Sequence, residues 1–505
     1  MTEVTQETPS AISGHLLQTA RSVFARWFGP KYDLRVLDAV LCTAAAQRLG
    51  GDPCWLLVVG GPGAAKTETI MALCNSGAVM ISTITGEAAL LSGTSQKDRA
   101  PDATGGLLGK VGSEGMMVIK DFTTIISQGR EQRAQVLAAL REIYDGKWNR
   151  EVGTDGGRTL SWEGKLVLIG AVTTAWDAAH TVISSMGDRF VLIRIDSTEN
   201  RREAGMQALR NVSHETEMRA DLAAAVTEAL GAVQKDAPID LVDAEMYQLL
   251  DLADVVTLAR TAVERDFQGN VVQAHAPEMP TRFLKQLAQI TRGGIALGMD
   301  RAEALDVAIR CAGDSMPPMR LAVLGDILAH PLSLYGETAK RLQLPRKSIE
   351  RVMQELHLLG LLAITEEKYG QGERWRYSIA QDISVDVLGK LARNGGPSSQ
   401  GDAKSAPKVA RNGGGASKSD GGKAARNGGP PAHEEQLTAP TTPPVDVDEP
   451  APAKPRTTRK PAKKKLPKQK CEHCRKSFTP AKLPAKYCRQ ACRTAAYTRR
   501  KKRGE

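Results

Sequence analysis

The sequence lacks several features that define other classes of protein. Its 505 residues contain no run of 18 or more apolar residues, so no segment is expected to span a membrane. The first 30 residues lack the charged and then apolar layout of a secretory signal. These absences favour a cytoplasmic protein, and its eight cysteines are therefore expected to be reduced unless they hold a metal.

Acidic side chains are almost missing from the end of the chain. Residues 451–505 contain 20 Lys and Arg but two Glu, whereas residues 1–450 contain 48 basic and 55 acidic residues. All the net positive charge thus lies in the last 55 residues. A terminus of this density usually binds nucleic acid, and a solvated tail without a partner is the alternative.

Another absence concerns residues 58–69, VVGGPGAAKTET, in which the residue immediately before the lysine is not glycine. The usual phosphate-binding loop, GxxxxGK[ST], has glycine where this chain has Ala65. Backbone N–H groups of such a turn bind phosphate, while Lys66 would reach the β- and γ-phosphates of ATP and Thr67 would hold Mg²⁺. The predicted nucleotide-binding residues are Gly60, Gly61, Pro62, Gly63, Ala64, Ala65, Lys66, Thr67 and Glu68.

A second carboxylate is missing from the strand GMMVIKDF, which supplies Asp121 alone. A nucleotide-hydrolysing site needs an acid here to hold Mg²⁺ and another to polarise the attacking water. If Asp121 is the metal-side acid, the water-activating residue is absent. If Asp121 replaces that residue, Lys120 stands where the metal-side acid should be. Both alternatives remain open from the sequence.

What is present predicts an α/β fold. Short apolar runs alternate with helical stretches and indicate a parallel five-stranded sheet; the runs are 56–59, 78–83, 116–119, 166–172 and 190–195. The predicted organisation is an N-terminal helix (1–30), an ATPase core (31–198), an all-helical lid (199–316), a winged helix-turn-helix (317–385), a disordered low-complexity basic linker (390–468) and a zinc ribbon with a basic tail (469–505).

The predicted winged helix has a third helix that begins with positive charge. Arg346, Lys347 and Arg351 would lie where such helices contact DNA, and a protein-docking role is the alternative. A hairpin turning at residues 370–372 would form the wing.

Four cysteines near the C-terminus have the spacing of a metal site. Cys471 and Cys474 are separated by two residues, and Cys488 and Cys492 by three. Four thiolates suffice for one tetrahedral Zn²⁺, and a redox pair or disulfide is the alternative. The segment resembles small bacterial zinc ribbons.

The stretch GGPGAAKT resembles the phosphate loop of minichromosome-maintenance helicases and MoxR-type ATPases of the AAA+ class. Those families carry Ala-Lys-Ser or Ala-Lys-Thr, which makes Ala65 a marker of the clade. The resemblance covers roughly residues 31–380. It implies a pre-sensor hairpin at 148–162 whose Arg150 and Arg158 could touch DNA, with solvated hairpin charges as the alternative.

The same resemblance implies further catalytic residues. Thr173 would be a polar sensor beside the γ-phosphate, Arg189 an arginine finger reaching a neighbouring subunit, and Arg282 the second sensor arginine. With Lys66 and Asp121 these complete the predicted catalytic set. An arginine finger implies a homo-oligomeric ring, such as a hexamer.

Three functions fit these features. The first is an ATP-dependent motor on single- or double-stranded DNA, a helicase or helicase-like replication protein of a bacterium, phage or mobile element. The second is a nucleotide-switched DNA-binding protein with weak hydrolysis, such as a helicase loader or a transcription or transposition regulator. A MoxR-like chaperone ranks third.

Overall fold

Five apolar runs form one parallel sheet in the computed structural model of the chain. The strands are β1 (Trp55–Gly60), β2 (Ala78–Ile81), β3 (Glu114–Ile119), β6 (Lys165–Val172) and β7 (Val191–Ile195). Their order is β2-β3-β6-β1-β7, and every neighbouring pair is parallel. The strands are nearly continuous in apolar residues because both faces of the sheet are covered. The predicted five-stranded sheet is confirmed.

The structure describes residues 9–95, 97–98, 100–184, 189–266, 268–370, 372–394, 469–471, 474 and 477–478. They belong to two compact units, Met1–Lys408 and Val409–Glu505, which are treated separately. In the second unit the described residues form an antiparallel pair, β12 (Gln469–Lys470) with β13 (Ser477–Phe478). None of the helices in the described ranges is long and apolar enough to cross a membrane.

Alternate residues of strand β1 enter two different cores. Leu56 and Val58 pack with helices of the N-terminal and lid segments, whereas Leu57 and Val59 pack on the opposite face. That second face holds a cluster of aromatic rings with centroids 5.2–6.1 Å apart; its members are Trp55, Phe122, Tyr144, Trp176 and Phe190.

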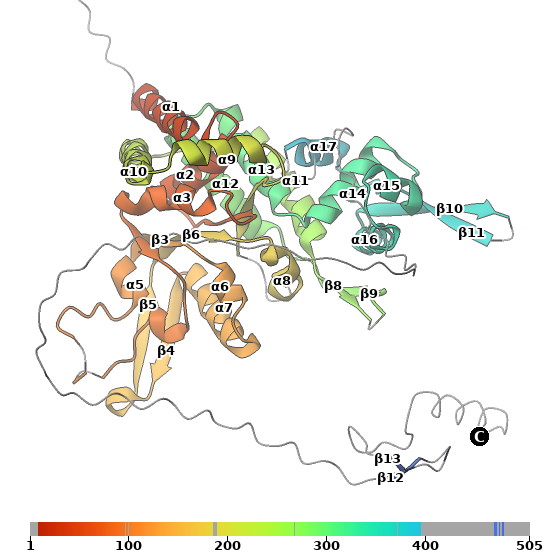
Figure 1. Ribbon diagram of the computed structural model, residues 1–505, viewed down its shortest axis with the longest axis horizontal. Helices are drawn as coiled ribbons and strands as arrows, with labels where there is room; N and C mark the ends of the chain where they lie inside the picture. The colour runs from red at the N-terminus through yellow and green to blue at the C-terminus, as the bar shows by residue number, and fades with distance from the viewer. Residues whose placement is uncertain are drawn as a thin grey trace, which may run out of the picture. The chain divides into compact units, whose positions relative to one another are not determined.

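The helices before and within the core surround this sheet. They are α1 (Pro9–Phe28), α2 (Leu34–Ala45), α3 (Lys66–Met71), α4 (Glu87–Leu90), α5 (Leu107–Val111), α6 (Thr123–Ile126), α7 (Arg130–Tyr144) and α8 (Ala175–Ser184). Between α7 and β6 lies an antiparallel hairpin, β4 (Lys147–Val152) with β5 (Arg158–Glu163), at the predicted place. Figure 1 shows this hairpin extending outward from the core.

The segment predicted to be an all-helical lid also contains strands. Its helices are α9 (Arg201–Arg210), α10 (Glu215–Gly231), α11 (Asp243–Arg260), α12 (Thr281–Ala296) and α13 (Arg301–Asp314). Between α11 and α12 runs a hairpin, β8 (Val263–Arg265) with β9 (Val271–Ala274), which corrects the prediction. Asp266 stabilises its turn by accepting hydrogen bonds from the backbone N–H groups of Gln268 and Asn270, both at 2.8 Å. Strands of three and four residues are too short to give a visible alternation.

The last part of the first unit combines helices with a long hairpin. Its elements are α14 (Pro318–Ala329), α15 (Tyr335–Arg341), α16 (Arg346–Leu358), β10 (Leu362–Tyr369), β11 (Gly372–Ile379) and α17 (Val385–Asn394). A bridge from Ser333 to Tyr377 adds a short third partner to the hairpin. Helix α17 extends into the segment predicted as linker because Leu388 and Leu391 are buried.

Candidate nucleotide site

The predicted phosphate loop connects strand β1 to helix α3. β1 ends at Gly60 and α3 begins at Lys66. Two loop residues have left-handed backbones, Gly63 with φ 78° and Ala65 with φ 55°. Glycine adopts this region freely, whereas the side chain of Ala65 makes it costly. No pattern in the sequence indicates this backbone strain at Ala65.

Lys66 lies folded back onto this loop. Its Nζ donates a hydrogen bond to the carbonyl oxygen of Gly61 at 2.6 Å, and the residue is 8% exposed. Burial lowers the pKa of Lys66, and the nearby carboxylate of Asp121 opposes that effect. A half-desolvated ammonium in a turn rich in backbone N–H groups suits an anionic ligand.

The two residues after Lys66 have different surroundings. Thr67 is exposed at the start of α3, so its hydroxyl is accessible to a ligand. Glu68 forms a bidentate ion pair with Arg219 of α10, at 2.8 and 3.0 Å. Glu68 therefore ties the loop helix to the lid segment, a role that the sequence did not indicate.

Asp121 follows β3 and faces the same region. Its Oδ2 accepts a hydrogen bond from the Thr124 hydroxyl at 2.6 Å, and its Oδ1 accepts one from the Thr123 backbone N–H at 3.0 Å. Burial raises the pKa of Asp121, but these hydrogen bonds more than offset it and hold the net pKa below the usual value. The next residue, Phe122, is 0% exposed within the aromatic cluster, so no second carboxylate follows Asp121.

Thr173 follows β6, the strand between β1 and β3. Its backbone N–H donates to the Thr123 hydroxyl at 3.1 Å, and its own hydroxyl accepts from Thr123 at 3.4 Å. Lys66, Asp121 and Thr173 thus share the carboxyl edge of the sheet. The chain leaves β1 toward β2 and leaves β6 toward β7, in opposite directions, and ligands of open α/β sheets bind at such a switch point.

Arg189 and Arg282 do not lie at the carboxyl edge of the sheet with Lys66, Asp121 and Thr173. Arg189 immediately precedes Phe190 and β7, and its Nη2 pairs with Asp145 at 3.3 Å. Burial lowers the pKa of Arg189, and the positive charge of nearby Arg282 lowers it further. Arg282 pairs with Glu278 at 2.9 Å and lines a cavity of about 470 Å³ with Asp145. Both arginines therefore lie at the amino edge of the sheet, which the six residues of β1 separate from Lys66 by roughly 20 Å.

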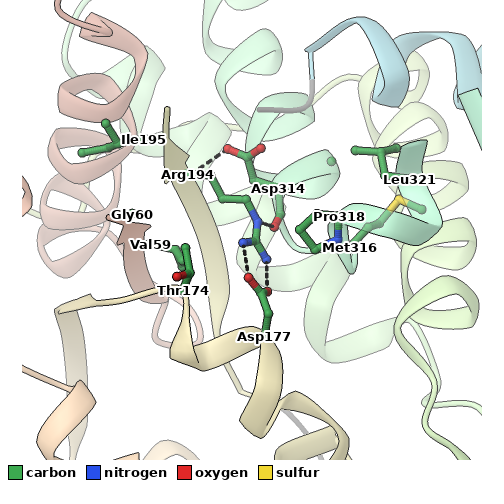
Figure 2. A pocket seen from close by; sticks show the side chains of 11 residues that line it. Val59, Gly60, Thr174, Asp177, Arg194, Ile195, Asp314, Met316, Pro318 and Leu321 are labelled. Carbon is green, nitrogen blue, oxygen red and sulfur yellow. Dashed lines mark hydrogen bonds and ion pairs between the residues drawn. The ribbon is translucent and has the colours of Figure 1, made fainter. Parts of the chain in front are cut away.

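A cavity of about 280 Å³ beside the loop was not predicted. Figure 2 shows the guanidinium of Arg194 between Asp177 and Asp314, with Met316 and Leu321 to the right of it in this view. Arg194 is 7% exposed, pairs with both oxygens of Asp177 at 2.7 and 3.0 Å, and donates to the Asp314 carbonyl at 2.7 Å. The sequence contains one indication of this arrangement, the arginine inside the apolar run FVLIRI. A charge in a buried strand needs a partner of opposite charge nearby.

The hairpin arginines contact the protein itself. Arg150 donates to the Leu91 carbonyl at 2.6 Å, and Arg158 donates to the Thr94 carbonyl at 2.7 Å. Thr154 adds a hydrogen bond to Gly93 at 2.7 Å. These side chains hold the hairpin against residues 91–94. Contact of Arg150 and Arg158 with DNA stays a prediction.

The basic residues of α16 divide into two kinds. Lys347 and Arg346 are exposed, and Arg346 lies over the Tyr335 ring, 4.7 Å from its centroid. Arg351 instead donates to the Gln268 carbonyl in the β8–β9 turn at 3.0 Å. Two of the three predicted contact residues therefore remain accessible.

Two of the four predicted zinc ligands fall outside the described residues. Cys471 is buried and Cys474 partly buried, whereas Cys488 and Cys492 are among the residues that the structure does not describe. Within the described ranges no group of three or more His, Cys, Asp or Glu could hold a metal. The zinc site stays a prediction.

Comparisons with known proteins find distant likenesses. No known family profile and no curated protein matches the sequence. A full-length MCM homolog from Methanopyrus kandleri matches 62% of this chain and 62% of its own length, with 13% identity and a TM-score of 0.35. Two apo structures of the NrS-1 C-terminal region match 72% of this chain and 75% of theirs, with TM-scores of 0.24 and 0.23 and identities of 10% and 9%. The chain thus spans less than two thirds of the length of the Methanopyrus protein.

Proposed function

We propose that this protein is an ATP-dependent AAA+ motor that acts on DNA, a helicase or helicase-like replication protein. The observation that carries the proposal is the meeting of Lys66, Asp121 and Thr173 at the carboxyl edge of a parallel sheet. A lysine in a glycine-containing turn, an acid and a polar side chain on adjacent strand ends are the parts that phosphoryl transfer requires.

In this proposal, water attacks the γ-phosphorus of ATP and the bond to the β–γ bridging oxygen breaks, which yields ADP and phosphate. Lys66 and the loop N–H groups bind the phosphates, and Thr173 orients the attacking water. Thr67 and Asp121 are the residues that would hold Mg²⁺, and their exposed hydroxyl and carboxylate oxygens fit its preference for oxygen ligands. Bound Mg²⁺ would neutralise charge on the phosphates.

The position of the arginines supports a ring of identical subunits. Because Arg189 and Arg282 lie roughly 20 Å from Lys66 of their own chain, they cannot reach its phosphates. A second copy could bring its amino edge against this carboxyl edge, so that each site is completed by its neighbour. Such a contact joins two different surfaces, and it closes into a ring when the rotation permits.

The proposed winged helix and the proposed zinc ribbon with its basic tail both favour DNA as the partner. We propose that α14–α16 with the β10–β11 hairpin form a winged helix, whose Arg346 and Lys347 are accessible to phosphates. The zinc ribbon and its basic tail would add salt-dependent affinity through counterion release.

A second function is favoured by one observation. The position after Asp121 is a buried phenylalanine, so hydrolysis would lack a water-activating carboxylate there. A protein of this kind could bind ATP as an assembly switch and hydrolyse it slowly.

Strand displacement separates the two functions. A motor should unwind a forked duplex in the presence of ATP, and Lys66→Ala should abolish the reaction. ATP-dependent DNA binding without displacement would favour the switch.

A further inference from the structure

Within the proposed function, on which this inference rests, Asp121 could either bind Mg²⁺ or activate the attacking water. The sequence left Asp121 either as the metal-side acid or as a substitute for the water-activating residue. The burial of Phe122 assigns position 122 to the core, where its ring centroid lies 5.2 Å from that of Phe190. Asp121 is therefore the one carboxylate that this strand end offers among the described residues.

Two threonines fix the direction of that carboxylate. The Thr124 hydroxyl donates to Oδ2 at 2.6 Å, and the Thr123 backbone N–H donates to Oδ1 at 3.0 Å. Rotation of the carboxylate would break both hydrogen bonds. The remaining lone pairs of the two oxygens therefore have a fixed direction. Mg²⁺ demands near-ideal octahedral geometry, so a fixed direction matters most for a metal ligand.

Thr123 also connects the two strand ends. Its hydroxyl accepts from the backbone N–H of Thr173 at 3.1 Å and donates to the Thr173 hydroxyl at 3.4 Å. The backbone N–H of Phe122 donates to the Ala171 carbonyl of β6 at 2.8 Å, which holds Thr123 at this distance. A single residue thus links the orientation of Asp121 on β3 to that of Thr173 on β6.

We infer that Thr123 and Thr124 are positioning residues that commit Asp121 to the metal side of the site. The Thr124 hydroxyl acts on the carboxylate alone, whereas Thr123 acts on Asp121 through its backbone N–H and on Thr173 through its hydroxyl. Partners that orient a metal ligand typically change metal affinity by about 10- to 100-fold when they are removed.

Equilibrium binding of a fluorescent ATP analogue, with the Mg²⁺ concentration varied, tests the inference without relying on turnover. Thr124→Val should raise the Mg²⁺ concentration for half-maximal binding about 10-fold. Its binding in EDTA should stay at the wild-type level. Thr124→Ser keeps the hydroxyl and should restore the wild-type Mg²⁺ dependence. Because Thr124 is exposed, both variants should fold, and thermal melts verify this.

Thr123→Val keeps the backbone N–H that binds Asp121 and removes the hydroxyl that binds Thr173. It should therefore lower the turnover number and leave the Mg²⁺ dependence at the wild-type level. An unchanged Mg²⁺ dependence in Thr124→Val would overturn the inference, whether or not turnover falls. If the wild-type protein bound no nucleotide at saturating Mg²⁺, the proposed function would fail and the inference with it.

Discussion

A single backbone angle sets Ala65 apart from its neighbours in the phosphate loop. Its φ of 55° places a residue with a side chain where glycine is favoured. A left-handed conformation costs a non-glycine residue roughly 1–2 kcal/mol. Such strain is retained at functional sites when the surrounding structure enforces it.

Ala65→Gly should therefore stabilise the protein by about 1 kcal/mol, because glycine relieves the strain despite its larger loss of chain entropy. Urea unfolding of the two proteins measures the difference. Ala64→Gly is the matched control, since the Ala64 backbone is not left-handed, and it should give no gain. Equal effects of the two substitutions would contradict the strain at Ala65.

At the same scale, the sequence indicated which residues meet at the carboxyl edge of the sheet but not all of their contacts. Lys66 follows β1 and Asp121 follows β3, and the ends of parallel strands lie at one edge of the sheet. The ion pair of Glu68 with Arg219 depends on a helix about 150 residues away, and no local pattern indicates it. The hydrogen bond from Arg150 to Leu91 likewise joins segments that are distant in the sequence, and no local pattern indicates it.

Helix α16 is joined to the lid segment by a buried ion pair. Arg320 of α14 donates to the carbonyls of Ala259 and Thr261, both at 2.7 Å, and its Nη2 pairs with Glu355 of α16 at 3.0 Å. Arg265 of β8 pairs with the other oxygen of Glu355. Glu355 is 3% exposed, so its charge depends on these partners.

Glu355→Gln should destabilise the protein by roughly 3–5 kcal/mol, because it leaves the guanidinium of Arg320 buried without its counter-charge. Urea unfolding again provides the measurement. Glu350→Gln lies on the same helix and removes no ion pair among the described residues, so it should change stability by less than about 0.5 kcal/mol. A loss for Glu355→Gln no larger than that control would mean that the pair contributes little.

Helices and strands with a clear hydrophobic pattern were predictable from the sequence, and very short strands were not. The five strands were evident because each is a short apolar run, although the edge strand β2 is only partly buried. The β8–β9 hairpin escaped because its strands are three and four residues long. Helix α17 escaped because it borders a low-complexity segment, although Leu388 and Leu391 pack into the core.

For the whole molecule, Lys66 and Arg189 of one chain are too far apart to act on the same nucleotide. The proposed ATPase site therefore needs Lys66 from one copy and Arg189 from its neighbour. Lys66→Ala and Arg189→Ala should each abolish hydrolysis when tested alone. Mixed in equal amounts they should regain activity at about a quarter of the contacts, where an intact loop meets an intact arginine. A mixture of Lys66→Ala with the double variant should regain none. Absence of recovery in the first mixture, with oligomers still formed, would contradict the shared site.

The steady-state ATPase rate of the purified protein, with and without single-stranded DNA, tests the central claim most directly. Lys66→Ala serves as the blank. The account predicts hydrolysis that depends on Lys66 and increases when DNA is added. ATP binding without appreciable hydrolysis, whatever DNA is present, would contradict a motor and leave a nucleotide-switched DNA-binding protein.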